Sequence, residues 1–230
     1  MANARSNIPT KEELTDLIIA DIALSIAFSI ILGFKNFIYY FPMALIAVTV
    51  SFILHEYMHK ITAQHFGAVA AFKRSDFGII IALVTSFIGF LMAMPGATMI
   101  YTNNFTKREN GIVSLVGPLT NLILFFIVFA LAFLIQFNTY IEATLIFTAF
   151  INLWLAFFNM LPIYPLDGSK VLSWNKLIYG TMLIATIVLL IYLTPFIGFS
   201  VIGMIYNIIF LLIIAIIMST LYRGILFRGF

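Results

Sequence analysis

Long apolar runs, separated by short polar stretches, alternate along almost the whole chain. The runs occupy residues 17–34, 43–66, 77–94, 112–136, 144–158, 177–193 and 199–221. Most of them reach the roughly 17–25 residues that an α-helix needs to cross the hydrocarbon core of a bilayer. The pattern predicts an all-α polytopic membrane protein in which residues 1–230 form a single transmembrane domain. The stretch 67–76 is expected to be a loop, and the stretch 98–110 is polar.

The composition excludes an ordinary soluble protein. Hydrophobic residues make up 63% of the 230 residues and charged residues only 9%, which is more apolar surface than one packed core can use. No room is left for a sizeable soluble domain, so we expect the lipid bilayer to surround the chain and no nucleic acid to bind it. The chain has no cysteine, so a metal ion would have to be held by His, Asp or Glu. The sequence leaves the oligomeric state open.

The apolar run 77–94 decides the number of membrane crossings. If it spans the bilayer, the chain crosses about seven times and the Lys and Arg residues divide rather evenly between the two sides. If it enters and returns on one side, the chain crosses about six times. In that case all but two of the 12 Lys and Arg residues lie on one side. The exceptions are Lys35, on the other side, and Lys60, within a span.

The second arrangement has the charge asymmetry that the positive-inside rule expects. We therefore predict about six transmembrane helices, with 77–94 re-entrant or packed inside the bundle. The protein would be a multi-pass integral protein of the cell membrane, with both termini and the candidate site towards the cytoplasm.

An HExxH sequence, His55-Glu56-Tyr57-Met58-His59, lies within the second apolar run. Four residues of helix place His55 and His59 on one face, where two imidazoles can bind one zinc ion. Glu56 lies beside that face and can act on a water molecule as a general base. Ionisable residues in a membrane span are costly and are candidates for function by default. The alternative is that both histidines are merely satisfied by backbone carbonyl groups.

A catalytic zinc ion usually has three protein ligands, so a third ligand must be found. His65 follows His55 at the spacing of the third metzincin histidine, but that arrangement needs a glycine where Thr62 stands. We expect His65 to lie at the end of the helix instead. Among the carboxylates, only Asp167 lies in a long apolar context with helix-breaking neighbours, Pro165-Leu166-Asp167-Gly168. The prediction is that this segment breaks the helix and that Asp167 is the third ligand.

Three motifs in this order resemble those of the site-2 protease family of intramembrane zinc metalloproteases. They are the HExxH sequence, the stretch Gly117-Pro118-Leu119-Thr120-Asn121, and the run 159–168, which contains Leu-Asp-Gly. The resemblance covers roughly residues 41–175 and implies a catalytic three-helix core there. The family usually has short strands between the first two core helices, whereas this region here holds the apolar run 77–94.

The resemblance also implies a set of site residues. One zinc ion would be held by His55, His59 and Asp167, with Glu56 as the catalytic residue. Asn159 and Asn121 are the residues that the resemblance implies for substrate binding.

The implied activity is hydrolysis of peptide bonds within the transmembrane segments of substrate proteins, as in regulated intramembrane proteolysis. Glu56 would activate a zinc-bound water and pass its proton to the leaving amine. A substrate helix must unwind locally, because its carbonyl groups are used in its own hydrogen bonds. A re-entrant 77–94 could offer an edge to the unwound strand.

Two other functions use the same residues. A membrane metal-ion or proton transporter could bind ions at the His, Glu and Asp cluster, although a transporter is expected to have internal repeats and a line of polar residues. The sequence has one cluster and no repeat. A catalytically inactive relative that acts as a binding partner would keep the fold without the chemistry. The sequence does not identify the substrate.

Overall fold

The computed structural model describes residues 8–89, 91, 94–102, 105–134, 139–197 and 213. Helices dominate, as the apolar pattern predicts. The helices are α1 (Lys11–Gly33), α2 (Phe37–Val48), α3 (Leu54–His65), α4 (Asp76–Ser86), α5 (Lys107–Leu134), α6 (Thr139–Asn159), α7 (Asp167–Trp174) and α8 (Lys176–Ile197). A short 3-10 turn, Phe34–Asn36, precedes α2, and a π-helical segment, Thr49–Ile53, joins α2 to α3.

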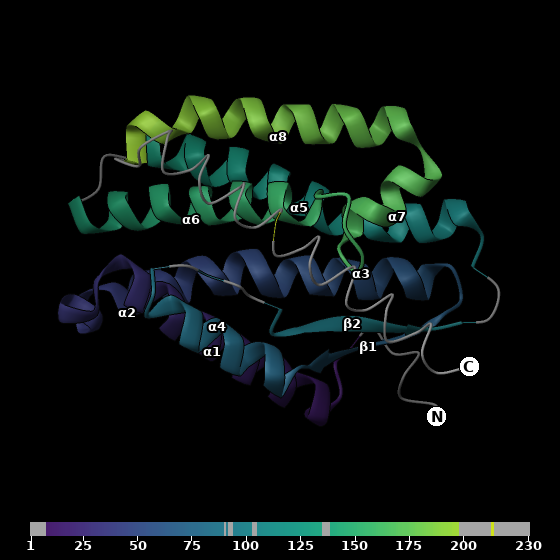
Figure 1. The fold of residues 1–230 in the computed structure, drawn as a ribbon, viewed down its shortest axis with the longest axis horizontal. Coiled ribbons are helices and arrows are strands. Elements are labelled where there is room, and N and C mark those ends of the chain that lie inside the picture. The colour runs from purple at the N-terminus through teal and green to yellow at the C-terminus, as the bar shows by residue number, and fades with distance from the viewer. Residues whose placement is uncertain are drawn as a thin grey trace.

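The α2–α3 helix lies in the middle of the molecule (Figure 1). On one side α3 packs against α5 and α2 packs against α6, with α8 beyond, and on the other side lie α1, α4 and a two-stranded sheet. α7 is a short helix that packs against α5. The helix with the HExxH sequence is therefore covered on both sides by the rest of the chain.

Four helical stretches among the described residues are long and apolar enough to cross a membrane: Lys11–His65, Lys107–Leu134, Thr139–Asn159 and Lys176–Leu193. The first stretch comprises two arms, because the chain reverses after Gly33, whose φ of 152° disfavours a residue with a side chain. Thr49 donates to Asp21 and Lys60 donates to Glu13, so the two arms run antiparallel.

These helices make the chain a multi-pass membrane protein. The count of about six crossings stays a prediction, because the last apolar run, 199–221, lies outside the described residues apart from residue 213.

The apolar run 77–94 does not form one long helix. Its helical part, α4, has 11 residues, which is shorter than the roughly 17–25 residues of a spanning helix. The strands β1 (Val69–Arg74) and β2 (Gly96–Tyr101) flank it and pair antiparallel, so that Arg74 lies opposite Gly96. The Ser75 N–H also donates to the Pro95 carbonyl at 2.8 Å. The chain therefore returns to the place from which it left the sheet.

The two strands were not predicted, since a loop was expected at 67–76 and only a polar stretch was noted from residue 98. In β1 the side chains of Ala70 and Phe72 are buried while those of their neighbours are less so, which is the period-two pattern of a strand. Six residues are too few for this pattern to stand out in so apolar a sequence. The strands lie between α3 and α5, where the resembling family usually has short strands, so the run 77–94 is added to the strands and does not replace them.

The chain breaks between α6, which ends at Asn159, and α7, which begins at Asp167. Pro162 and Pro165 lie in this gap, and neither has the N–H that a continuous helix needs. Gly168 lets the start of α7 approach the end of α6, because a Cβ atom there would lie 2.3 Å from the Met160 carbonyl oxygen. The break turns the chain back so that Asp167 faces the interior.

A buried ion pair ties the first helix to the HExxH helix. The Lys60 Nζ atom lies 2.6 Å from Glu13 Oε2, and both side chains are almost fully buried. The other carboxylate oxygen of Glu13 accepts the Phe72 N–H of β1 at 3.1 Å. Glu13 therefore joins α1, α3 and β1.

Replacing Lys60 by methionine should destabilise the protein by about 3–5 kcal/mol, because Glu13 would be left as an uncompensated buried charge. The double variant Glu13→Gln, Lys60→Met should recover much of this loss, since the charge is removed while an oxygen remains for Phe72. Denaturant unfolding in detergent micelles would measure both. A single Lys60→Met variant as stable as the unaltered protein would show that the pair does not hold the helices together.

Candidate metal centre

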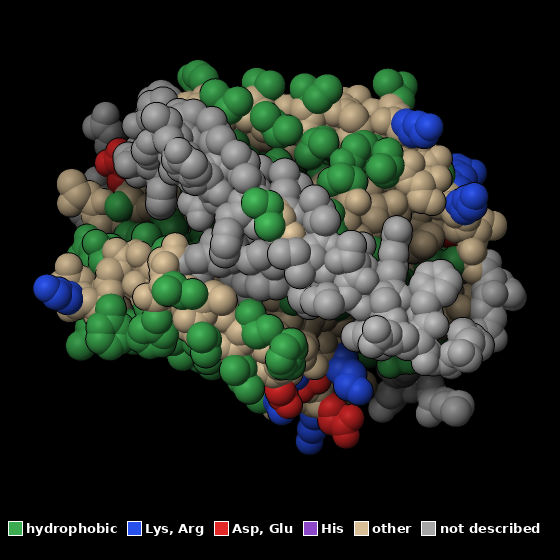
Figure 2. Space-filling view, viewed as in Figure 1, with side chains coloured by type: hydrophobic (Ala, Val, Ile, Leu, Met, Phe, Trp, Pro, Cys, Tyr) green, Lys and Arg blue, Asp and Glu red, His purple; other side chains and the backbone are tan. Residues whose placement is uncertain are grey.

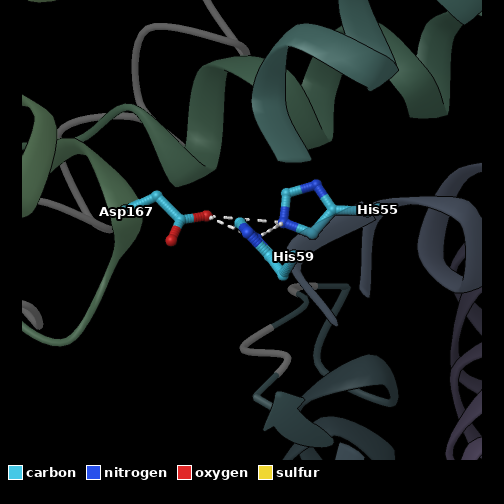
Figure 3. Close-up of side chains that lie close together, drawn as sticks. All are labelled: His55, His59 and Asp167. Carbon is cyan, nitrogen blue, oxygen red and sulfur yellow. Dashed lines mark hydrogen bonds and ion pairs between the residues drawn. The ribbon is translucent and has the colours of Figure 1, made fainter. Parts of the chain in front are cut away.

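His55 and His59 of α3 lie close to Asp167, the first residue of α7, although the two helices are far apart in the sequence. The two Nε2 atoms lie 3.0 Å apart, and Asp167 Oδ2 lies 3.1 Å from His59 Nε2 and 3.4 Å from His55 Nε2. Figure 3 shows the three side chains pointing toward one another. Their exposed fractions are 4%, 6% and 8%. In the described part of the chain, they are the one group of three or more potential metal ligands within reach of a single ion.

The hydrogen bonds of the other ring nitrogens fix both histidine tautomers. His59 Nδ1 lies 2.7 Å from the Val113 carbonyl oxygen, which can only accept, so this nitrogen carries the proton. His55 Nδ1 faces the side-chain oxygen of Asn121. That atom is the amide oxygen, because the Asn121 amide nitrogen donates to two other oxygens. In the neutral form that binds metals, both histidines therefore direct the lone pair of Nε2 at the centre.

The centre thus collects three acceptor atoms that cannot satisfy one another. Both imidazoles must be neutral to bind a metal, and an ionised Asp167 then faces two nitrogen lone pairs. A shared cation relieves this repulsion, and two imidazole nitrogens with one carboxylate are ligands that zinc accepts. The residues present fit a metal ion, and the alternative of two histidines satisfied only by backbone carbonyls does not account for their Nε2 atoms.

Asn121 orients His55 through a fully buried network. Its amide nitrogen donates to the Ser51 carbonyl at 2.9 Å and to the Asn152 side-chain oxygen at 3.0 Å. Asn152 in turn donates to the Thr148 carbonyl at 2.9 Å. Sequence reasoning missed Asn152, although an amide within an apolar run, two helical turns before Asn159, was a usable signal.

Gly117 provides the space for the centre. A Cβ atom at this position would lie 2.4 Å from His59 Nε2 and 2.7 Å from His55 Cε1. The glycine therefore allows α5 to pass directly against the two imidazole rings. The Gly117–Asn121 stretch thus acts twice on the same site: the glycine leaves room and the asparagine sets the tautomer of His55.

A cavity of about 370 Å³ opens beside the three ligands. His55, Glu56, His59 and Asp167 line it, as does Asn159 at the end of α6. The Asn159 amide nitrogen donates to the Leu155 carbonyl of its own helix at 3.0 Å. Several water molecules fit a cavity of this size.

The other predicted site residues lie in different surroundings. α3 stays helical through His65, whose ring contacts Phe66, so His65 is at the helix end as expected and away from the centre. Asn121 is fully buried and does not line the cavity. Its predicted role in binding substrate stays a prediction, and so does that of Asn159.

An HExxH metal centre buried among apolar helices places the chain in the class of membrane metalloproteases. Comparison with known proteins agrees. The profile of peptidase family M50 matches residues 135–181, which include all of α6 and Asp167. A protein of Methanocaldococcus jannaschii, named as a candidate zinc metalloprotease, is 40% identical over 173 residues, which are 74% of this chain and 88% of that protein.

A protein of Bacillus subtilis with the same descriptive name is 32% identical over 165 residues, covering 60% of this chain and 73% of that protein. The identity and the length of these matches are sufficient to assign the chain to a family. The chain belongs to peptidase family M50, the site-2 protease family.

Replacing Gly117 by alanine should abolish tight metal binding while the helices remain, because the new methyl group would occupy the position of the ligand atoms. Metal analysis of the purified protein and circular dichroism would measure the two properties. Gly180→Ala is the matched control, since nothing lies within 4 Å of a Cβ atom there. A Gly117→Ala variant with unchanged metal content would contradict this geometry.

Replacing Asn121 by alanine should weaken metal binding about 10–100-fold, because His55 would lose the partner that fixes its tautomer. Asn159→Ala removes the same amide from the cavity wall and should leave metal affinity unchanged. Competition with a chelator would measure both affinities. Equal losses in the two variants would show that the Asn121 network does not act on His55.

Proposed function

We propose that the chain is an intramembrane zinc endopeptidase, which hydrolyses peptide bonds within transmembrane segments of other membrane proteins. The observation that carries the proposal is the convergence of two histidine lone pairs and a buried carboxylate beside Glu56, at the wall of a cavity. Membership of peptidase family M50 and the names of the two relatives support zinc and proteolysis.

His55, His59 and Asp167 would hold one zinc ion. When bound, the ion supplies Lewis-acid catalysis, because it polarises a peptide carbonyl and increases the acidity of a water molecule. Glu56 is the general base. Its carboxylate takes a proton from the water that attacks the carbonyl carbon, and it returns that proton to the amine nitrogen as the C–N bond breaks. The products are a carboxylate and an amine.

The substrate would reach the cavity along an apolar wall. A smaller cavity of about 30 Å³ shares Leu24, Phe52, Leu155 and Phe158 with the larger one. Its remaining lining residues are also apolar. Such a surface suits the side chains of a transmembrane segment, and the polar groups around Glu56 suit its backbone.

The bound segment would be extended, because a helix hides its carbonyl groups in its own hydrogen bonds. Residues Gly96 to Ile100 of β2 line the cavity, so β2, apart from the Thr98 N–H that donates to Glu56, is the candidate edge for pairing with the bound segment. Asn159, at the same wall, has an amide suited to holding a strand backbone. In this proposal Asn159 contacts substrate and Asn121 orients a ligand.

The proposed orientation has both termini and the site towards the cytoplasm of the cell membrane. In Figure 2 apolar side chains cover α8 and α4, and Lys and Arg lie mainly at the right and lower edges of this face. On α4 the exposed apolar residues are Phe77, Ile80 and Val84. This apolar face, together with the return of the chain to the sheet, supports a segment that dips into the bilayer from one side.

Three variants test the assignment of roles. The purified protein should contain about one zinc ion, which Asp167→Ala should lose and His65→Ala should keep. Glu56→Gln should keep zinc but cleave a single-span reporter protein about 10²–10⁴-fold more slowly, because only the base is lost. Metal analysis and reporter cleavage in detergent micelles would measure these effects.

Two outcomes would count against the proposal. A protein that purifies without tightly bound metal would favour an ion transporter. A Glu56→Gln variant that cleaves the reporter at the unaltered rate would show that Glu56 is not the base.

A further inference from the structure

We propose that Thr98 is a positioning residue for Glu56: it holds one carboxylate oxygen so that the other faces the cavity as the proton acceptor. The inference rests on the proposed function, which makes Glu56 the general base. It assigns a role to a strand residue that lies 42 positions from the HExxH glutamate.

Thr98 binds Glu56 through both its backbone and its side chain. The Thr98 N–H donates to Glu56 Oε2 at 2.9 Å, and the Thr98 hydroxyl lies 2.8 Å from the same oxygen. The hydroxyl also lies 3.1 Å from the Glu56 carbonyl oxygen. Glu56 Oε1 has no such partner among the residues that the structure describes. One oxygen of the carboxylate is therefore anchored, and the other is left for water.

This division matters because glutamate has a long, flexible side chain. A free Glu56 carboxylate would populate several rotamers, and only some of them would bring an oxygen to the attacking water. If the carboxylate is already held in the productive rotamer, the reaction does not have to restrict its conformational freedom. A small displacement of a catalytic group can lower a rate by orders of magnitude. In the described part of the chain no hydrogen bond joins Thr98 to His55, His59 or Asp167, so its effect should be separable from metal binding.

The position of Thr98 is itself fixed by a circuit of contacts that joins β2 to β1, β1 to α1, α1 to α3, and α3 back to β2. In the sheet Thr98 pairs with Phe72, whose N–H donates to Glu13. Glu13 binds Lys60, which follows Glu56 by four residues on the same helix face. Phe72 of β1 thus donates its N–H to Glu13, and Thr98 of β2 donates its N–H to Glu56. Both N–H groups point away from the partner strand, and both glutamates are buried. The circuit holds β2 at a set distance from α3.

Replacing Thr98 by valine tests the inference, because valine has a similar shape and lacks the hydroxyl. With the single-span reporter, kcat should fall about tenfold or more, but less than in Glu56→Gln, since the backbone N–H remains. KM, zinc content and thermal stability should stay near those of the unaltered protein. Thr98→Ser should restore kcat. Thr15→Val, which removes an exposed hydroxyl that bonds only within α1, is the control for the substitution itself.

Four results would overturn the inference. An unchanged kcat in Thr98→Val would mean that the hydroxyl does not act on Glu56, and a raised kcat would mean that Thr98 restrains the base. A Thr98→Ser variant as slow as Thr98→Val, or a loss of zinc in both, would indicate a packing role. Failure of the proposed function is distinguishable, because Glu56→Gln would then cleave the reporter as fast as the unaltered protein.

Discussion

The arrangement of three acceptor atoms at the centre is the constraint on which the rest of the structure depends. Two imidazole nitrogens and an ionised carboxylate face each other at 3.0–3.4 Å in a buried place, which is unfavourable unless a cation lies among them. α3, α5 and α7 meet at this point. The break after Asn159 turns Asp167 toward this point, and the glycine at position 117 leaves room there for the two imidazole rings.

The groups around the centre show how an apolar protein keeps polar side chains at depth. Asn121 and Asn152 are fully buried, and their amides are matched to one another and to backbone carbonyls, so that neither polar side chain is left unsatisfied. The sheet supplies the second support. It joins Glu56 to Glu13 and Lys60, and it thereby connects the first helix to the proposed general base.

The sequence singled out the candidate metal ligands more readily than the residues that position them. The spacing of His55 and His59 and the helix breakers around Asp167 are local signals, and the structure brings these three residues together. Asn152 and Thr98 act through partners 31 and 42 positions away, so their roles depend on how helices and strands pack. The strands were missed because each has only six residues in a sequence that is apolar almost throughout.

X-ray absorption at the zinc edge of the purified protein would examine the centre itself. The structure predicts one zinc ion with two imidazole nitrogens at about 2.0–2.1 Å and oxygen ligands at about 2.0–2.2 Å, and one imidazole fewer in His59→Ala. A spectrum with three imidazole ligands would replace Asp167 by His65. The absence of zinc from protein purified without chelators would contradict a metalloprotease centre at this site.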